Sequence, residues 1–294
     1  FRDLAIQRRE NDLVGASFGR GFFVLDDYSV LREVTEQSLT KEAELFSTRD
    51  AWWFIPRSQL SFDDQKGTQG DPHYVAPNPD FGAVFTYYLK DGLKTSTELR
   101  KEKEKKGSVS FPGWDAVGKE ATESKPEIWL TVKDESGKVI RRILGNTKKG
   151  FHRIAWDLRY PSSSSVSMIS PQINSHGRLA LPGTYSVSLS KNVNGVVTEL
   201  SDPIEFKVKR LRNGALKGAD PATLTSFWNE YDDIVEKSSN MENRLSALSK
   251  TIKAMSTALN QSKSSPGDLD KRLYEVKLSL TDIDVELHGN PAKL

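Results

Sequence analysis

The chain has 294 residues, 28% of them charged, and a formal net charge of +2. This balance gives no basic stripe of the kind that binds nucleic acid, and no apolar run approaches the roughly 18–20 residues of a membrane-spanning helix. The chain has no cysteine, which excludes disulfides, thiol catalysis and thiolate metal sites.

Residues 1–56 begin with short β-rich runs at 4–6, 13–18 and 22–27, and the GRG before the last run predicts a hairpin turn. Three short antiparallel strands are typical of part of a β-propeller blade, which has about four strands. Such a unit cannot bury its apolar faces alone. Its missing partners are expected from preceding chain or from a returning strand within AELFSTRDAWWF, residues 43–54. The chain starts with Phe1 rather than Met, which indicates a longer precursor.

Residues 57–80 are polar, with glycine and proline, and are predicted to be a linker or a long surface loop. Residues 81–212 contain about six or seven β-rich runs, a number and spacing that favour an immunoglobulin-like β-sandwich. Hairpin turns are predicted at Glu135-Ser136-Gly137 and at Asn194-Gly195, the latter a strong hairpin signal. The charged interruption TELRKEKEKKGSVSFPGW is predicted to be a solvated insertion.

Residues 220–289 are predicted to form two helices. Asp220 and Pro221 have the residue types favoured at an N-cap and at the first helical position. For the second helix, Ser265 is the predicted cap, with Pro266 at the first position and Asp268 completing a capping box.

Both helical segments carry apolar residues at alternating spacings of four and three, which is a coiled-coil seam. In the first segment the seam positions are Phe227, Tyr231, Ile234, Ser238, Met241, Leu245, Leu248, Ile252, Met255 and Leu259. In the second they are Leu269, Leu273, Val276, Leu280, Ile283 and Leu287. At 1.5 Å per residue the segments span about 60 and 35 Å, so an antiparallel hairpin covers only half of the first helix. The uncovered aromatic half is expected to pack on the sandwich or on the propeller.

No group of residues predicts a reaction centre. The four histidines lack the spacing of metal sites: they are His73, His152, His176 and His288. Adjacent carboxylates occur at Asp26-Asp27 and Asp63-Asp64, but neighbours on a strand point to opposite faces, whereas a glycosidase needs two carboxyls across its substrate. The serine run 162–165 lacks a GxSxG elbow. We therefore expect no catalytic residue, no metal ligand and no cofactor in this chain.

Aromatic residues provide the candidate binding residues. Trp52, Trp53 and Trp114 have ring faces that can stack on sugar rings. Aromatic residues beside a linker also fill seams between domains, and both interpretations are open at this point.

The order of several strings resembles one known family. NDLVGASFGRGFFVLDD followed by LREVT is similar to the last blade of sortilin-like bacterial propellers, usually called BNR-repeat or glycosyl-hydrolase-like proteins; Phe18 stands where that family often has histidine. FGAVFTYYLKDG, GFHRIAWDLRYP and LPGTYSVSL resemble the sandwich that follows the propeller, which is similar to the immunoglobulin-like domain of flagellar-hook-capping proteins. The helices also have a counterpart, so the resemblance covers nearly the whole chain.

The resemblance implies a non-catalytic C-terminal region of an exported protein, periplasmic, outer-membrane-associated or extracellular. Its partners would be the upstream propeller blades of the same precursor and a protein or glycan ligand. In the alternative, the intact protein is a secreted glycosyl hydrolase or other hydrolase whose catalytic residues lie on blades before Phe1. A third possibility is a carbohydrate-binding sandwich built on the three tryptophans.

Overall fold

The structure is a computed structural model that describes residues 2–19, 21–56, 76, 78–107, 111–167, 171, 177–214, 218–290 and 292–293. Most of the predicted linker 57–80 lies outside these ranges, as do His73, His176, Asp63 and Asp64. The chain divides into two compact units, one formed by residues 1–160 and 179–217 and the other by 161–178 and 218–294. None of the described helices combines the length and the apolar character that crossing a membrane requires.

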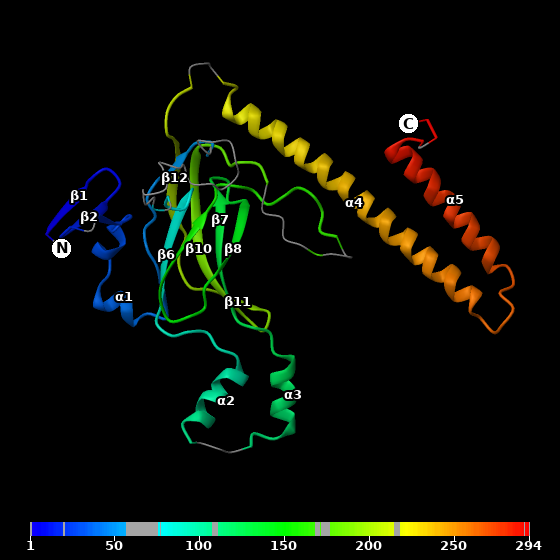
Figure 1. The fold of residues 1–294 in the computed structure, drawn as a ribbon, viewed down its shortest axis with the longest axis horizontal. Helices are drawn as coiled ribbons and strands as arrows, with labels where there is room; N and C mark the ends of the chain where they lie inside the picture. The colour runs from blue at the N-terminus through cyan, green and yellow to red at the C-terminus, as the bar shows by residue number, and fades with distance from the viewer. Residues whose placement is uncertain are drawn as a thin grey trace. The chain divides into compact units, whose positions relative to one another are not determined.

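The first unit begins with a three-stranded antiparallel sheet in the order β1-β2-β3 (Figure 1). Its strands are β1 (Asp3–Gln7), β2 (Asp12–Ser17) and β3 (Gly21–Leu25), so the three predicted strands are confirmed. We call this the N-terminal sheet. A 3₁₀ helix (Ser29–Arg32) and a short helix α1 (Glu36–Thr40) follow it.

The remaining strands of this unit form two sheets, which we call the two-sheet domain. One sheet has the order β5-β12-β10-β7-β8, with β11 paired to β10, and the other has the order β4-β6-β9. The strands are β4 (Ala43–Leu45), β5 (Ala51–Trp53), β6 (Ala83–Leu89), β7 (Glu127–Asp134), β8 (Val139–Gly145), β9 (Gly150–Trp156), β10 (Gly183–Val193), β11 (Val196–Glu199) and β12 (Ile204–Arg210). Every pairing is antiparallel except that of β12 with β5.

One apolar core lies between the two sheets. Phe85 of β6, Leu130 of β7 and Val187 of β10 are 0% exposed and belong to this core. The ring of Phe85 meets that of Phe206 on β12 edge-on, with 5.4 Å between the centroids. Alternate side chains of a strand point to the same face, so the alternating apolar residues of the sequence place these groups inward.

The returning run 43–54 joins the two-sheet domain instead of the N-terminal sheet. β4 pairs with β6 and β5 pairs with β12, and Leu45 and Ala51 are buried in the domain's core at 5% and 3% exposed. The expectation that this run supplies a missing strand to the N-terminal sheet is wrong. The two-sheet domain thus begins at β4, before the predicted boundary at residue 56, because its core needs these apolar side chains.

The two predicted hairpin turns are confirmed. β7 pairs with β8 around Gly137, and β10 pairs with β11 around Asn194-Gly195. Asn194 and Gly195 have φ angles of 53° and 83°, the positive values that a type I′ turn requires at both central residues.

The charged insertion between β6 and β7 consists of helices α2 (Ser96–Lys105) and α3 (Trp114–Thr122). The Arg100 guanidinium donates to the Glu120 carboxylate at 2.9 Å and to Glu104 at 2.6 Å. These bonds raise the pKa of Arg100, and the bond from Arg100 lowers the pKa of Glu120. A capping box of Thr95 and Glu98 supports α2, and the contacts of Arg100 with Glu120 connect α2 to α3. Neither feature is an apolar stripe, which is why the sequence indicated only a solvated insertion.

The second unit contains α4 (Pro221–Asn260) and α5 (Leu269–His288), which fold back on each other as the predicted hairpin (Figure 1). The Asp220 carboxylate accepts the Thr223 N–H at 3.1 Å, so the first predicted cap is confirmed. The capping box predicted from Ser265 is wrong: α5 begins at Leu269, after a turn closed by its N–H on the Pro266 carbonyl at 3.2 Å.

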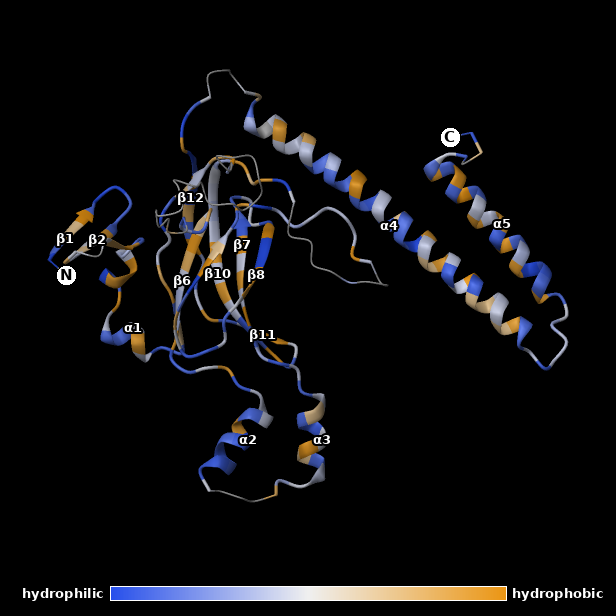
Figure 2. Ribbon diagram, viewed as in Figure 1, coloured by the Kyte–Doolittle hydropathy of each residue, from blue (hydrophilic) through white to orange (hydrophobic). Residues whose placement is uncertain are grey.

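Of the described residues, about 34% are helical and about 29% lie in strands. The chain is therefore mixed α and β, whereas the sequence predicted a mainly β fold with a helical C-terminus. The difference comes from α2 and α3, which the sequence predicted only as a solvated insertion. In Figure 2 hydrophobic residues concentrate in the strands of the two-sheet domain and recur at intervals along α4 and α5.

Candidate functional site

The strongest candidate site is the N-terminal sheet, because it is apolar on both faces. Directly paired residues of neighbouring strands point to the same face. One face therefore carries Leu4, Gly15 and Phe23 in one row and Ile6, Leu13 and Leu25 in the next. The other face carries Ala5, Val14 and Val24, then Asp3, Ala16 and Phe22.

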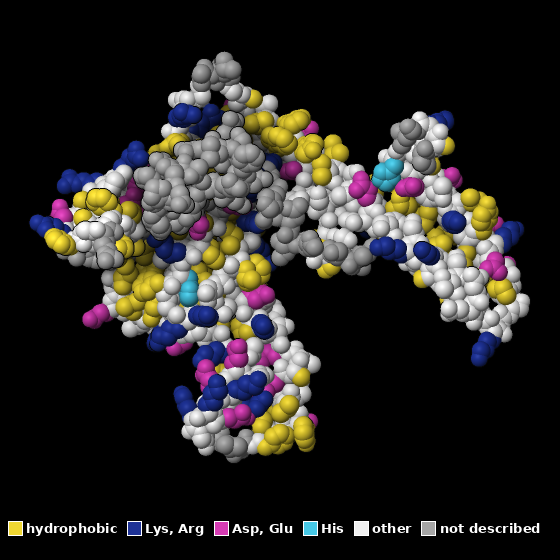
Figure 3. All heavy atoms as spheres, viewed as in Figure 1, with side chains coloured by type: hydrophobic (Ala, Val, Ile, Leu, Met, Phe, Trp, Pro, Cys, Tyr) yellow, Lys and Arg dark blue, Asp and Glu magenta, His cyan; other side chains and the backbone are white. Residues whose placement is uncertain are grey.

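Both faces of this sheet are open. On the first, Leu4 and Phe23 are 60% and 56% exposed; on the second, Phe22 and Val24 are 78% and 55% exposed. Figure 3 shows hydrophobic side chains at the surface of this sheet. Strands that are apolar on both faces are typical of a sheet buried between two layers. The arrangement is thus suited to packing between two further sheets.

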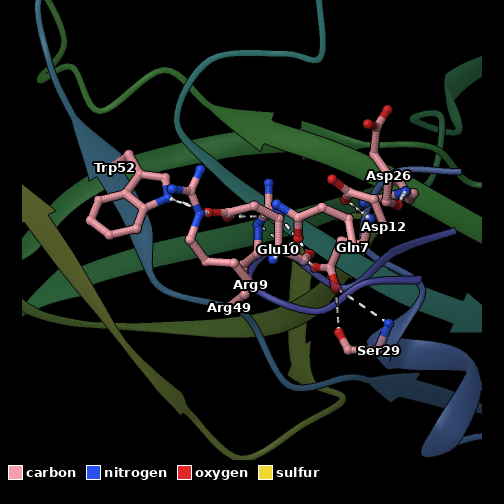
Figure 4. Close-up of polar contacts among 10 residues, drawn as sticks. Gln7, Arg9, Glu10, Asp12, Asp26, Ser29, Arg49 and Trp52 are labelled. Atoms are coloured by element: carbon pink, nitrogen blue, oxygen red, sulfur yellow. Dashed lines mark hydrogen bonds and ion pairs between the residues drawn. The ribbon is translucent and has the colours of Figure 1, made fainter. Parts of the chain in front are cut away.

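A polar cluster joins the N-terminal sheet to the two-sheet domain (Figure 4). Glu10 lies in the turn between β1 and β2, and its side chain is 15% exposed. Its carboxylate accepts the indole N–H of Trp52 on β5 at 3.2 Å and pairs with Arg49 at 3.3 Å and with Arg9 at 2.9 Å. Because charge-assisted hydrogen bonds are directional, this cluster fixes the turn against β5.

A second set of contacts holds the end of β3, which lies beside the turn between β1 and β2 at the same end of the sheet. The buried Asp27 carboxylate accepts the Ser29 hydroxyl at 2.5 Å, and the Asp27 N–H donates to the Asp12 carboxylate at 3.0 Å. The guanidinium of Arg153 on β9 donates to the Asp26 carbonyl oxygen at 2.7 Å. Asp26-Asp27 therefore forms a structural corner after β3, which the N-terminal sheet holds through Asp12 and the two-sheet domain holds through Arg153 of β9.

The structure does not bring the three predicted binding tryptophans together. Trp52 and Trp53 are neighbours on β5 and point to opposite faces: Trp52 donates to Glu10, while Trp53 packs against the core and donates to the Ala180 carbonyl oxygen at 2.7 Å. Trp114 begins α3 and is 80% exposed, and its ring lies 5.1 Å from that of Phe111. Stacking on a glycan stays a prediction, and of the three tryptophans Trp114 is the exposed one, with the ring of Phe111 beside it.

The two described histidines belong to different units and each has a local partner. The His152 Nε2 lies 2.6 Å from the Lys148 carbonyl oxygen, and the His288 Nδ1 lies 2.9 Å from the Asp284 carboxylate. Among the residues that the structure describes, no group of three or more acidic, histidine or cysteine side chains is placed to hold a metal ion.

One side chain of the core has a strongly shifted pKa. Burial raises the pKa of Tyr87 to about 12, so its phenol stays protonated at neutral pH. The hydroxyl donates to the Asn146 carbonyl oxygen at 2.8 Å and accepts the Asn146 N–H at 2.5 Å. These bonds give Tyr87 a structural role, holding the loop between β8 and β9.

The sequence did not indicate the cluster around Glu10. Glu10 and Trp52 are 42 residues apart, and no spacing rule connects a carboxylate in a turn with a strand tryptophan at that distance. The available signal was the run QRREN, which places a carboxylate among arginines at a turn. This run indicates a polar contact but does not predict its partner.

Comparison with known proteins gives no match: no family model, no curated protein and no solved structure is significantly similar to this chain. The resemblance to sortilin-like propellers therefore stands on the sequence strings alone.

Proposed function

We propose that this chain is a non-catalytic accessory region of a β-propeller protein, in which the N-terminal sheet belongs to a blade and the two-sheet domain braces that blade. The observation that carries the proposal is that the N-terminal sheet is apolar on both faces and exposed on both. A propeller blade is a sheet of about four strands, and neighbouring blades cover its faces.

Hydrophobic burial supplies the driving force for this assembly. Removing apolar surface from water contributes roughly 25 cal/mol per Å², and an aromatic side chain buries about 150–250 Å². Phe22 and Phe23 point to opposite faces and are 78% and 56% exposed. A sheet packed on only one face would leave one of these rings in water. The exposed rings therefore favour a position in which further sheets cover both faces.

The occupants that we propose are blades of the same polypeptide. The resemblance to the last blade of sortilin-like propellers supports this choice, because its strings coincide with β2 and β3. In this proposal the two-sheet domain is the immunoglobulin-like domain that follows the propeller, and the parent protein is exported.

The contacts of Glu10 and Asp26 supply the bracing. They connect the turn between β1 and β2 to β5, and the end of β3 to β9. Both contacts lie at the end of the sheet where β3 meets the turn between β1 and β2, so that end of the blade is fastened to both β5 and β9. The domain would then act as a rigid support for the blade.

Hydrogen exchange tests the proposal. In this chain alone we expect the amides of β1 and β3 to exchange quickly, because an uncovered sheet opens locally at low cost. In the parent protein with its blades, the same amides should exchange at least about a hundredfold more slowly, while those of β10 are unchanged. Equal exchange of β1 and β3 in the two proteins would contradict the proposal.

The hydrolase alternative is tested separately. Incubating this chain with a glycan and peptide panel should give no turnover, because the carboxylates of Glu10, Asp12 and Asp27 in the N-terminal sheet and its corner are held in structural hydrogen bonds. Turnover by this chain would contradict a non-catalytic role. If the parent protein shows turnover that is lost when carboxylates on its other blades are substituted, that result would place the catalytic residues on those blades.

A further inference from the structure

The hairpin of α4 and α5 uses only half of its apolar seam. In heptad notation, the seam residues alternate between positions a and d. The a positions at the helix contact are buried or half-buried: Leu245, Ile252 and Leu259 on α4, and Leu273, Leu280 and Leu287 on α5. The d positions are 41–51% exposed: Met241, Leu248 and Met255 on α4, and Leu269, Val276 and Ile283 on α5.

The exposed d positions of the two helices lie on one face of the hairpin. At 3.6 residues per turn, position d is displaced by about 60° from position a around the helix axis. The two helices run in opposite directions with their a positions facing each other. The displacement therefore goes to the same side on both helices, and the two rows form one apolar surface, which we call the d face.

The opposite side of the hairpin has a different character. A groove of about 660 Å³ lies there between the helices, and its lining combines the a residues Leu245, Ile252 and Leu280 with polar side chains such as Lys253 and Asp284. The groove side mixes apolar and charged side chains, whereas the d face carries apolar side chains along both helices, so the hairpin is a two-helix layer with one more uniformly apolar face. Two such layers packed by their apolar faces make a four-helix bundle.

We propose that the d face binds the d face of a second copy of this chain, forming a dimer through a four-helix bundle. A two-fold interface brings the same surface of both copies together, so each apolar row meets an apolar row. The proposal is independent of the proposed function, since it concerns the other unit of the chain.

The size of the d face is sufficient for a dimer. The 20 residues of α5 give a contact length of about 30 Å, and two adjacent helices are about 20 Å wide. The face thus covers roughly 600 Å² per copy, or about 1,200 Å² in the dimer, at the lower end of stable interfaces.

The charges beside the d face fit the same symmetry. Arg272 and Glu286 each precede an a position of α5, next to the d face, and both are exposed. Each is seven residues from Ser279. A two-fold axis perpendicular to the helices and level with Ser279 brings α5 antiparallel to its counterpart, with Arg272 of each copy level with Glu286 of the other. Opposite charges then meet at both ends.

The oligomeric state of the full chain tests this inference. Light scattering after size exclusion should give twice the chain mass of 32.9 kDa. Val276→Glu should weaken the dimer at least about tenfold, since it places a charge in the apolar interface. Leu278→Glu is the matched control: Leu278 is 46% exposed, close to the 49% of Val276, but it lies about 200° further around α5, away from the d face.

Two further variants complete the test. Because the chain has no cysteine, Val276→Cys and Leu278→Cys each carry a single thiol, and only the thiol at 276 should be protected from maleimide. Phe22→Lys should leave the dimer intact, since Phe22 belongs to the other unit. Circular dichroism checks that each variant keeps its helices. A monomer at all concentrations, equal effects at 276 and 278, or a dimer abolished by Phe22→Lys would overturn the inference.

Discussion

Two β regions of the first unit are built from the same kinds of residue and differ in what covers them. In the two-sheet domain, Phe85 of β6 is 0% exposed, whereas Phe22 of β3 in the N-terminal sheet is 78% exposed. The two sheets of the domain cover each other's inner faces, but the N-terminal sheet has no second layer among the described residues. An apolar strand therefore predicts that another layer covers it, but it does not predict which part of the protein supplies that layer.

The largest expected effect is on the better-covered region. Gly82 has a φ of +112°, and a Cβ there would lie 1.8 Å from the Trp156 carbonyl oxygen. Gly82→Ala should therefore destabilise the two-sheet domain by at least about 3 kcal/mol, measured by urea unfolding. Gly137 has a φ of +83° with nothing within 4 Å, so Gly137→Ala is the matched control and should cost about 1 kcal/mol. Equal costs would show that the close approach is unimportant.

The second prediction compares the two phenylalanines directly. Phe85→Ala should cost about 3–5 kcal/mol, since it opens a cavity in a filled core. Phe22→Ala should change the free energy of unfolding by less than about 0.5 kcal/mol, because its ring is already in water. Both values come from the same urea unfolding experiment. A large cost at Phe22 would mean that this chain itself covers the N-terminal sheet.

The third prediction concerns the junction between the regions. Trp52→Phe keeps the ring but removes the N–H that donates to Glu10 at 3.2 Å. A hydrogen bond to a charged group contributes about 1.5–3 kcal/mol, so amides of β1 and β2 should exchange at least about tenfold faster. Trp129 donates to Glu127 at 2.9 Å within β7, and Trp129→Phe should leave that exchange unchanged. If both variants behave alike, the junction does not depend on Trp52.

The smallest effect is expected in the α2–α3 insertion, which charge supports instead of a core. The pKa of Glu120 is lowered from its ordinary 4.5, chiefly by the hydrogen bond from Arg100. A lowered pKa means that the stabilisation is complete above pH 4.5 and is lost as the pH falls through the folded value. The protection factors of the α2 amides, which correct for the intrinsic pH dependence of exchange, should therefore fall in acid below that point. In Glu120→Gln this acid dependence should be reduced, and an unchanged profile would contradict the role of the pair.

Local patterns predicted the elements whose causes are local. Alternating apolar residues and the Asn194-Gly195 turn gave the strands and hairpins of the two-sheet domain, and the heptads gave α4 and α5. The sequence could not predict which sheets β4 and β5 join, because each strand has only three residues and its partner lies far along the chain. The Glu10 cluster could not be predicted either, because Glu10 and Trp52 are 42 residues apart. The d face shows a further limit: a seam indicates that residues pack, but not how many helices share it.

The parallel pair of β5 and β12 has a mechanical consequence. Ala51 is in register with Val208 and Trp53 with Arg210, and the Leu211 N–H extends the pair by donating to the Trp53 carbonyl oxygen at 3.1 Å. Tension between the chain before β5 and the chain after β12 pulls on opposite ends of these strands. In that geometry the hydrogen bonds are sheared together and do not open one after another. The β5–β12 pair thus resists tension between these two points of the chain, and the chain before β5 is itself held in the domain by the pairing of β4 with β6.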